Sequence, residues 1–477
     1  MRSSNLINGE WVAADDAAVI DVANPATGGV ICRVPDVGRA GALRAIDAAC
    51  SAQQAWAATP AAERGGLLSA LSLLMKRDAD RLAQLMTEEQ GKPVAEARGE
   101  IAYAASFLDW AAEEGTRLNG DIVPASTADK RILVLRQPVG ITAIITPWNF
   151  PAAMITRKLG PALACGCTTI IKPAEETPLS ALAIGELAVE AGIPAGVVNI
   201  ITGDPGKIGE ALFDDDRVRK LSFTGSTEVG RMLMSQASKN LLRLSLELGG
   251  HAPFIVFDDA DLDLAVKAAV ACKFRNAGQT CICANRFYVQ AGIAEAFTAR
   301  FARAVERLSV GNGLDAGVDV GPLINDSAIE KVEAHVDDAC TLGGDILVGG
   351  KRIAVEGLAD RFYAPTLISG MTPEMLVSRE ETFGPVAPVA TFRDEAEVIE
   401  LANASEYGLA AYFFTRDASR LMRVAEALEY GIIGANDGAP STAQAPFGGV
   451  KHSGFGREGG SYAMREYTEL KYVSWRL

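Results

Sequence analysis

The sequence has very few histidines, three in 477 residues. Histidine and cysteine are the commonest ligands of zinc and related metals, so a metal centre would be short of ligands. The eight cysteines are scattered, and the close pairs Cys165/Cys167 and Cys281/Cys283 have C-x-C spacing, which differs from the C-x-x-C of zinc ribbons. We therefore expect neither a metal site nor a disulfide framework.

Positive charge and long apolar runs are also scarce. The 45 lysines and arginines are outnumbered by 60 aspartates and glutamates, and the resulting formal charge of −15 argues against a phosphate-tracking surface. No apolar run approaches the ~18–20 residues that cross a bilayer, and the first residues lack the basic and apolar regions of a signal peptide. We expect a cytoplasmic protein that binds neither nucleic acid nor membrane.

Hydrophobic periodicity divides the chain into a helical opening and two alternating series. Apolar residues at three-and-four spacing predict helices over residues 40–59 and 61–90, with a stop at Gly91-Lys92-Pro93. Short β-branched runs alternate with helical segments over residues 140–248, and again over residues 253–427. Strands that alternate with helices form parallel sheets covered on both faces, so the sequence predicts two α/β domains.

A glycine turn is the candidate phosphate site. Thr224-Gly225-Ser226 follows a predicted strand and opens a helix, where backbone N–H groups and the helix dipole could hold a pyrophosphate. Arg231-Met232 stands where a P-loop needs Lys-Ser/Thr, so a nucleotide-hydrolysing loop is disfavoured. A tight turn without a ligand is the alternative, because glycine is the default residue at positive φ.

Lys172 and Glu175 lie at the end of another strand of the same series. At the edge of a parallel sheet, Lys172 could bind ribose hydroxyls, and Glu175 could accept from the 2′-hydroxyl while repelling a 2′-phosphate. This pair favours NAD as the cofactor, with NADP as the other candidate. A solvated ion pair is the alternative reading of the two side chains.

Cys281 is the candidate nucleophile, because it follows a polar, glycine-bearing segment suited to a loop. A reactive thiol needs a depressed pKa or an adjacent base, and no histidine lies in a motif that could serve. Glu247, at the end of an apolar strand, is the candidate base, since burial would raise its pKa towards the range of a general base. An inert buried thiol and a capping or salt-bridged carboxylate are the alternatives.

Asn149 is the candidate oxyanion donor. It lies between two prolines in Pro147-Trp148-Asn149-Phe150-Pro151, directly after the first strand of the series. A side-chain amide held there could donate to a developing oxyanion. An ordinary turn-forming asparagine is the alternative.

Together these motifs resemble those of one family. In order, the chain carries Pro147-Trp148-Asn149-Phe150-Pro151, Lys172-Pro173-Ala174-Glu175, Phe223-Thr224-Gly225-Ser226, Glu247-Leu248-Gly249-Gly250, Gly278-Gln279-Thr280-Cys281, Glu381-Thr382-Phe383-Gly384-Pro385 and Pro446-Phe447-Gly448-Gly449-Val450-Lys451-His452-Ser453-Gly454. The series is similar to that of NAD(P)-dependent aldehyde dehydrogenases. It covers nearly the whole chain, and seven ordered motifs are far more specific than any one of them.

The resemblance implies a fold and an assembly. It implies a Rossmann-like cofactor domain over residues 1–124 and 142–248, an α/β catalytic domain over 249–445, and a small β oligomerisation element over 125–141 and 446–477. A homodimer or homotetramer is expected. The β-leaning segments 130–137 and 469–475, which are separate from both series, could pair with each other or with another subunit.

The resemblance also implies site roles. Trp148, Glu381 and Phe383 would contact the cofactor, with the last two positioning the nicotinamide ribose and ring. Cys281 would attack the aldehyde, and the alkoxide would be held by Asn149 and the Cys281 N–H. Loss of hydride to the nicotinamide would leave a thioester, which water activated by Glu247 would hydrolyse.

Within the family, the chain is most similar to succinate-semialdehyde dehydrogenases, in which residues matching Arg157, Arg275 and Ser441 grip the distal carboxylate of the substrate. Arginine suits this task because its donors are bidentate and permanently charged, although a structural arginine is the alternative. Ala439-Pro440 replaces larger apolar residues, so glutarate or α-ketoglutarate semialdehyde would fit the same cations. The resemblance further suggests that oxidation joins Cys283 to Cys281 and inactivates the enzyme.

Several other activities remain as alternatives. A general aldehyde dehydrogenase would share every motif except the arginine pair. A CoA-acylating enzyme would discharge the thioester to a thiol and is disfavoured by Glu247, and a cysteine hydrolase is disfavoured by the lack of a histidine partner. A catalytically idle binding protein on the same fold would be expected to have lost Cys281 or Glu247.

Overall fold

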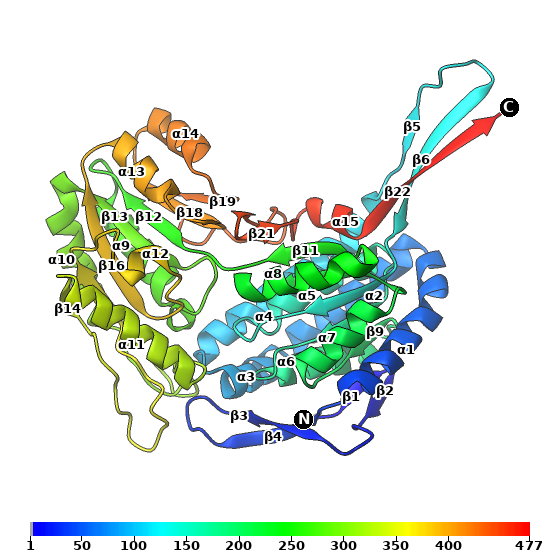
Figure 1. Cartoon of the computed structure of the whole chain (residues 1–477), viewed down its shortest axis with the longest axis horizontal. Coiled ribbons are helices and arrows are strands. Elements are labelled where there is room, and N and C mark those ends of the chain that lie inside the picture. Colours follow the sequence, from blue (N-terminus) through cyan, green and yellow to red (C-terminus); the bar gives the residue numbers. More distant parts are fainter. Residues whose placement is uncertain (1–2) are drawn as a thin grey trace.

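A mostly parallel sheet organises the first α/β unit (Figure 1). In the computed structural model, which describes residues 3–477, its parallel strands are β9 (Val198–Ile200), β8 (Thr169–Lys172), β7 (Ile141–Ile145), β10 (Val218–Thr224) and β11 (Arg243–Glu247), in this spatial order. Antiparallel strands β1 (Asn5–Ile7), β2 (Glu10–Val12) and β21 (Gly454–Phe455) extend its edges. Helices α5 (Ala153–Ala164), α6 (Pro178–Glu190), α7 (Pro205–Asp214) and α8 (Thr227–Ala237) connect the parallel strands. The α/β alternation predicted for residues 140–248 is confirmed.

Four long helices precede the parallel strands of this sheet: α1 (Gly38–Ala58), α2 (Ala61–Arg77), α3 (Ala79–Gln90) and α4 (Val94–Glu114). The stretch 61–90 was expected to be continuously helical, but it breaks at Asp78, which separates α2 from α3. Gly91 then ends α3 at φ +96°, where an added Cβ would lie 2.7 Å from the Pro322 ring. Helix α4 was not predicted because Pro93, taken as a stop, directly precedes its first turn, where the missing N–H of proline costs no hydrogen bond inside the helix.

A second parallel sheet forms the other α/β unit. Its strands, in spatial order, are β14 (Asp345–Val348), β15 (Thr366–Ser369), β16 (Val386–Phe392), β13 (Ala284–Gln290), β12 (Ala252–Val256), β18 (Ala410–Phe414) and β19 (Ile432–Ala435), of which only β14 is antiparallel to its neighbour. The accompanying helices are α9 (Leu262–Phe274), α10 (Ala294–Val305), α11 (Asp326–Thr341), α12 (Leu376–Arg379), α13 (Glu395–Asn403) and α14 (Ala418–Ala427). The α/β alternation predicted for residues 253–427 is confirmed.

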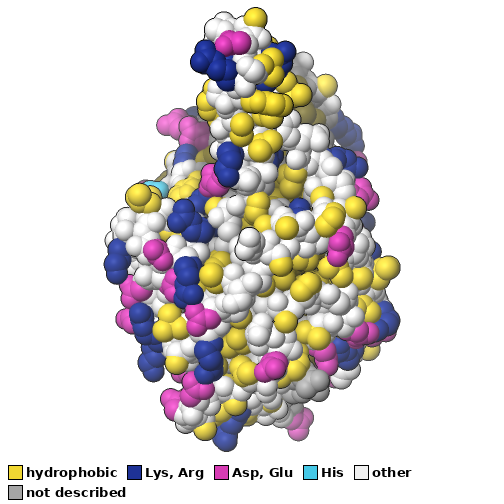
Figure 2. Space-filling view, turned by 90° about the vertical axis from the view of Figure 1, so that its right-hand side faces the viewer, with side chains coloured by type: hydrophobic (Ala, Val, Ile, Leu, Met, Phe, Trp, Pro, Cys, Tyr) yellow, Lys and Arg dark blue, Asp and Glu magenta, His cyan; other side chains and the backbone are white. Residues whose placement is uncertain are grey.

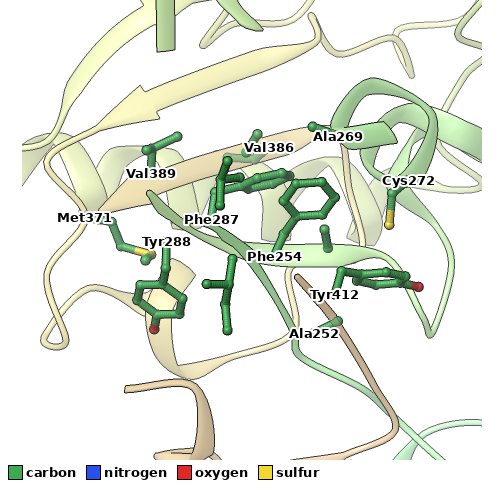
Figure 3. Close-up of a cluster of buried hydrophobic side chains, with 14 of the residues drawn as sticks. Ala252, Phe254, Ala269, Cys272, Phe287, Tyr288, Met371, Val386, Val389 and Tyr412 are labelled. Carbon is green, nitrogen blue, oxygen red and sulfur yellow. The ribbon is translucent and has the colours of Figure 1, made fainter. Parts of the chain in front are cut away.

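The core of the second unit is aromatic. Phe254 on β12 packs against Phe287 on β13, with ring centroids 5.1 Å apart (Figure 3). It also packs against Phe414 on β18, with centroids 4.9 Å apart. Full burial of such a side chain contributes about 1.5–3 kcal/mol. The three rings therefore fix the central strands relative to one another, and with them the loop that leads into β13.

A three-stranded sheet projects from the body as an arm, built from β5 (Asp121–Val123), β6 (Lys130–Pro138) and β22 (Thr468–Arg476) (Figure 1). Strands β6 and β22 pair in antiparallel fashion along their whole length, so the two β-leaning segments of the sequence pair with each other. Strand β20 (Val450–Lys451) pairs instead with β17 (Tyr407–Gly408), and β21 with β11. Residues 446–460 thus lie against the two large units rather than in the arm, and the domain boundaries stay a prediction.

The remaining elements are short. They are β3 (Val19–Ala23), β4 (Val30–Pro35), α15 (Tyr462–Glu466) and the 3₁₀ turns η1 (Gly115–Arg117), η2 (Ser238–Asn240), η3 (Arg275–Gly278) and η4 (Ala291–Ile293). Among residues 3–477, no helix combines the length and apolar character needed to span a bilayer. Within the same residues, no three or more His, Cys, Asp or Glu side chains gather to hold a metal ion. The cytoplasmic location stays a prediction.

Candidate active site

The predicted motifs meet at one edge of the first sheet. Strand β7 leads into the Asn149 segment, β8 ends at Lys172, β10 ends at Thr224 and β11 ends at Glu247. From β7, the chain adds β8 and β9 on one side and then returns to add β10 and β11 on the other. Ligands of open α/β sheets bind outside the carboxyl ends of the strands at such a switch point.

A strained turn places Cys281 opposite this edge. Asn276, Ala277 and Gly278 all adopt positive φ, at 53°, 54° and 77°. A Cβ on Gly278 would lie 2.1 Å from the Gly384 carbonyl oxygen, so only glycine fits. The Asn149 Nδ2 donates to the Gln279 carbonyl at 3.0 Å and thereby joins the turn to the end of β7.

Cys281 opens onto a cavity of about 320 Å³ between the two units. The same cavity is lined by Arg157, Arg275 and Ser441, so the predicted nucleophile and the predicted carboxylate-binding residues share one pocket. Its walls also include Lys92, Glu96, Glu100, Tyr103, Phe150, Met154, Ala439 and Phe447. Except for Ala439, which was singled out for its small size, none of these was predicted as a pocket residue.

The Cys281 thiol is protonated in the resting protein. Burial raises its pKa to about 12, although the nearby Arg157 charge opposes the shift. The thiol therefore needs a proton acceptor before it can attack a substrate. Within residues 3–477, the backbone N–H of Cys281 and the Oδ1 of Asn149 have no hydrogen-bond partner.

Glu247 is buried at the end of β11, and its Oε2 has no hydrogen-bond partner in the described part of the chain. Burial and the neighbouring Glu458 raise its pKa well above the ordinary value, against the charges of Arg157 and Lys158. A carboxylate with a raised pKa is a stronger base than an exposed one. Glu247 can therefore accept a proton near Cys281.

Arg157 is paired inside the protein. Its Nε donates to the Glu458 Oε2 at 2.7 Å, and the Lys158 Nζ lies 2.5 Å from the other carboxylate oxygen. Although burial acts in the opposite direction, these two cations lower the pKa of Glu458, which stays ionised. Lys158 and Glu458 were not predicted as site residues. Adjacent cations in the otherwise apolar helix α5 were the available signal for Lys158.

Arg275 and Ser441 occupy other parts of the cavity wall. Arg275 is half-buried, lies 5.4 Å from the Phe150 ring centroid, and has no carboxylate within 4 Å among residues 3–477. The Ser441 hydroxyl is hydrogen-bonded to that of Tyr103. Arg275 is thus the cation of this pocket whose charge no ion pair neutralises.

The glycine turn after β10 forms the start of a helix, as expected for an anion site. The Ser226 Oγ accepts the Val229 N–H at 3.2 Å and caps α8, while the Gly225 N–H donates to the Glu247 carbonyl at 3.1 Å. The Thr224 hydroxyl accepts from the Lys158 Nζ at 2.5 Å. Thr224 therefore connects the glycine turn to the buried charges beside Glu247.

The other predicted cofactor residues lie around the same edge. Lys172 and Glu175 form an ion pair with each other. The Glu381 carboxylate accepts the Gly250 N–H at 3.0 Å, and burial raises its pKa to about 7. Trp148 and Phe383 come from different units and meet edge to face, with centroids 5.6 Å apart.

Comparison with known proteins identifies the family. A profile of the aldehyde dehydrogenase family matches residues 11–473. The chain belongs to this family. It is 56% identical, over 99% of its length and 97% of the relative, to the NADP(+) succinate-semialdehyde dehydrogenase GabD of Escherichia coli K12, and equally to a glutarate-semialdehyde dehydrogenase of Pseudomonas putida KT2440. The crystal structure of a Burkholderia pseudomallei succinate-semialdehyde dehydrogenase matches with a TM-score of 0.98 at 52% identity, covering 100% of this chain and 98% of that one.

The second cysteine of the pair lies away from the pocket of this aldehyde dehydrogenase. Cys283 is buried, and its Sγ donates to the Lys273 carbonyl at 3.4 Å, whereas Cys281 faces the cavity. Both thiols are free. A link between them would require Cys283 to leave this contact, and the redox role of Cys283 stays a prediction.

Proposed function

We propose that the chain oxidises an aldehyde with a distal carboxylate to the dicarboxylic acid, using NAD(P)⁺ as hydride acceptor. The observation that carries the proposal is the single cavity shared by Cys281 and Arg275. On a chain with a formal charge of −15, an anionic substrate needs a local cation, and a guanidinium without an ion-pair partner is suited to that task.

In the proposed mechanism, Cys281 attacks the aldehyde carbon while its proton passes to a nearby base. The alkoxide accepts hydrogen bonds from the Asn149 amide and from the Cys281 N–H, which has no other acceptor in the described chain. Each such donor is typically worth about 2.7–4 kcal/mol in the transition state. After hydride has left the substrate carbon, Cys281 carries a thioester.

Glu247 is the proposed base for the second half of the reaction. Its raised pKa lets it take a proton from water, and the hydroxide attacks the thioester carbon. The carbonyl carbon–sulfur bond breaks, the acid leaves, and the thiol of Cys281 is restored. Because Glu247 is close enough to Cys281 to influence its thiol and would activate water there, discharge to a thiol such as CoA is disfavoured.

The cofactor residues fit a dinucleotide. The amino terminus of α8 at Ser226 presents backbone N–H groups for a pyrophosphate, and Trp148, Glu381 and Phe383 lie at the same edge of the sheet. Bound NAD(P)⁺ supplies the hydride acceptor. Glu175 favours NAD, since a carboxylate repels a 2′-phosphate; the name of the Escherichia coli relative keeps NADP as the second candidate.

Succinate semialdehyde is the proposed substrate, with glutarate semialdehyde as the second candidate. Relatives that carry these two names are equally similar to the chain. Ala439 lines the cavity where a larger apolar residue was expected, which leaves room for a substrate with a longer carbon chain. α-Ketoglutarate semialdehyde is a further candidate, because its distal carboxylate would face the same cations, Arg157 and Arg275.

The arm is the proposed assembly surface. Hydrophobic side chains gather on it (Figure 2), and Ile122, Leu470, Tyr472 and Trp475 are each more than half exposed. Exposed apolar patches of this kind mark interaction sites. We propose that they pack against another copy of the chain in a homodimer or homotetramer, which light scattering of the intact protein and of an Ile122→Asp/Leu470→Asp variant would test.

A substrate panel tests the proposed function. NADH or NADPH absorbance is followed with linear aldehydes of three to five carbons, each with and without a terminal carboxylate, and each with and without CoA. The proposal expects CoA-independent turnover with a higher kcat/KM for the carboxylated member of every pair. A folded, reduced protein that oxidises none of the aldehydes with either cofactor would overturn it.

A further inference from the structure

Lys92 is a fully buried cation next to the active site, in the turn between α3 and α4. Its Nζ lies 2.5 Å from the Glu100 Oε2 and 2.7 Å from the Asn149 carbonyl oxygen. It also lies 3.9 Å from the centroid of the Phe150 ring. Two of the three N–H groups of the ammonium thus have acceptors inside the protein, and the ammonium also contacts the Phe150 ring. The contacts of Lys92 are directed at the protein, although its side chain lines the cavity.

The contacts of Lys92 hold the segment that carries Asn149. The Asn149 carbonyl accepts a second hydrogen bond, from the Asn276 Nδ2 at 3.0 Å. The other oxygen of Glu100 accepts the N–H groups of Ala152 and Ala153, at 2.9 and 3.2 Å, where α5 begins. The Lys92–Glu100 pair thus binds the chain at the Asn149 carbonyl and again three to four residues later, at the start of α5.

The Phe150 ring connects this pair to the predicted substrate cation. Its centroid lies 3.9 Å from the Lys92 ammonium and 5.4 Å from the Arg275 guanidinium. Both distances are within the range of a cation–π interaction. Lys92 is thus one of the contacts that hold Phe150 next to Arg275.

The energetics favour a positioning role over a purely stabilising one. Burial lowers the pKa of Lys92, and the charge of Glu100 offsets only part of this effect. A buried ion pair is often no more stable than well-packed apolar residues of similar volume, so stability alone is a weak reason for this arrangement. Fixed donors on the Asn149 carbonyl, by contrast, restrict the direction in which its side-chain amide points.

We propose that Lys92 is a positioning residue that fixes the Asn149 backbone, so that the Asn149 amide faces the oxygen of the aldehyde attacked by Cys281. The inference deepens the proposed function and rests on it. Lys92 touches neither the reacting carbon nor the oxygen, and acts through Asn149. A misplacement of about 1 Å can cost a factor on the order of 10² in rate, so removal of Lys92 should slow the chemical step.

The test uses the holoenzyme and a neutral replacement of the pair, Lys92→Met/Glu100→Gln, which leaves no buried charge without a partner. We expect the rate constant of the first-turnover NADH burst to fall by about tenfold or more, while KM for the aldehyde and Kd for NAD⁺ change by less than about threefold. Lys220→Met/Glu466→Gln is the matched control, because the Lys220 Nζ lies 3.7 Å from the Glu466 Oε2. Lys220 is also fully buried and bonded to Ser245, and it faces the Tyr467 ring at 5.0 Å, but it has no contact with Asn149. Its replacement should leave the burst unchanged.

A double-mutant cycle with Asn149→Ala separates positioning from general destabilisation. If Lys92 acts through the Asn149 amide, the neutral pair should change the burst rate by less than about twofold in the Asn149→Ala background. Full additivity of the two effects, or an unchanged burst in the neutral pair, would overturn the inference. Both results would leave the proposed function intact as long as the unmutated enzyme oxidises aldehydes. An unmutated enzyme that is inactive would count against the proposed function itself.

Discussion

The guanidinium of Arg157 is bound to the carboxylate of Glu458 inside the protein, with Nε 2.7 Å from Oε2 and neither side chain more than 4% exposed. The same guanidinium lies 3.9 Å from the centroid of the Phe447 ring. Arg275, which lines the same cavity, has no carboxylate within 4 Å among residues 3–477. The two arginines, equivalent in the sequence argument, therefore differ in how much charge they offer a substrate.

This difference predicts separable effects of the two arginines. Arg275→Ala should raise KM for succinate semialdehyde about 10- to 150-fold, because a charge-assisted hydrogen bond contributes about 1.5–3 kcal/mol, and should leave propanal nearly unaffected. Arg157→Ala should lower kcat for both substrates, since it leaves Glu458 without its main partner and changes the field at Glu247. Steady-state kinetics on the two aldehydes measure both effects. Equal losses of Arg275→Ala on succinate semialdehyde and propanal would remove Arg275 from carboxylate recognition.

Asn149 should contribute to the chemical step rather than to binding. Its Nδ2 keeps one N–H on the Gln279 carbonyl, and an amide has a second N–H to donate. We expect Asn149→Ala to lower the burst rate by a factor on the order of 10²–10³, the usual value of an oxyanion donor, with KM changed little. Rapid-mixing measurement of NADH formation checks this. Unaltered hydride transfer would exclude Asn149 from the mechanism.

Cofactor affinity should depend on the ionisation of Glu381. Burial raises the pKa of this carboxyl to about 7, so it is mostly protonated at pH 6 and mostly ionised at pH 8. A carboxylate is a stronger acceptor than a protonated carboxyl, so with Glu381 on the nicotinamide ribose, as proposed, we expect Kd for NAD⁺ to rise by up to about tenfold as the pH falls from 8 to 6. Titration calorimetry at several pH values measures this dependence. Glu381→Gln should bind more weakly with a flat profile, and a sloping profile in that variant would assign the titration to another group.

Much of the scaffold could be predicted because its signals are local. The strands β7 and β8 are short β-branched runs, β10 and β11 are short apolar runs that alternate with helices, and their shared direction brings Asn149 and Glu247 to one edge. Helix α4 was missed because a proline that starts a helix and one that stops a helix look alike in a sequence. The pairs Arg157–Glu458 and Lys92–Asn149 could not be predicted, since they join residues 301 and 57 positions apart and only the packed fold brings them together.

The Cys281 thiol should react slowly in the enzyme without cofactor. Burial raises its pKa to about 12, and the thiolate is the reactive form, so the rate of alkylation by iodoacetamide should rise about tenfold per pH unit between pH 7 and 9. Peptide mass spectrometry follows Cys281 separately from the exposed Cys50 and Cys340, which serve as internal references. A plateau in Cys281 labelling below pH 8 would contradict the raised pKa.

Oxidation should link Cys281 to Cys283 only slowly. Cys281 faces the cavity and is the thiol that peroxide reaches first, which gives a sulfenic acid and water; attack by the Cys283 thiol then forms the disulfide and releases a second water. Cys283 is buried and hydrogen-bonded to the Lys273 carbonyl, so the second step requires it to leave that contact. We expect peroxide-treated enzyme to lose activity at the rate of sulfenic acid formation, with the disulfide appearing later and dithiothreitol restoring activity.

The Cys283→Ser variant should be inactivated equally fast but recover less, because the sulfenic acid of Cys281 then has no neighbouring thiol and oxidises further. Full recovery of Cys283→Ser, or no Cys281–Cys283 peptide in the native enzyme, would exclude the redox role of Cys283.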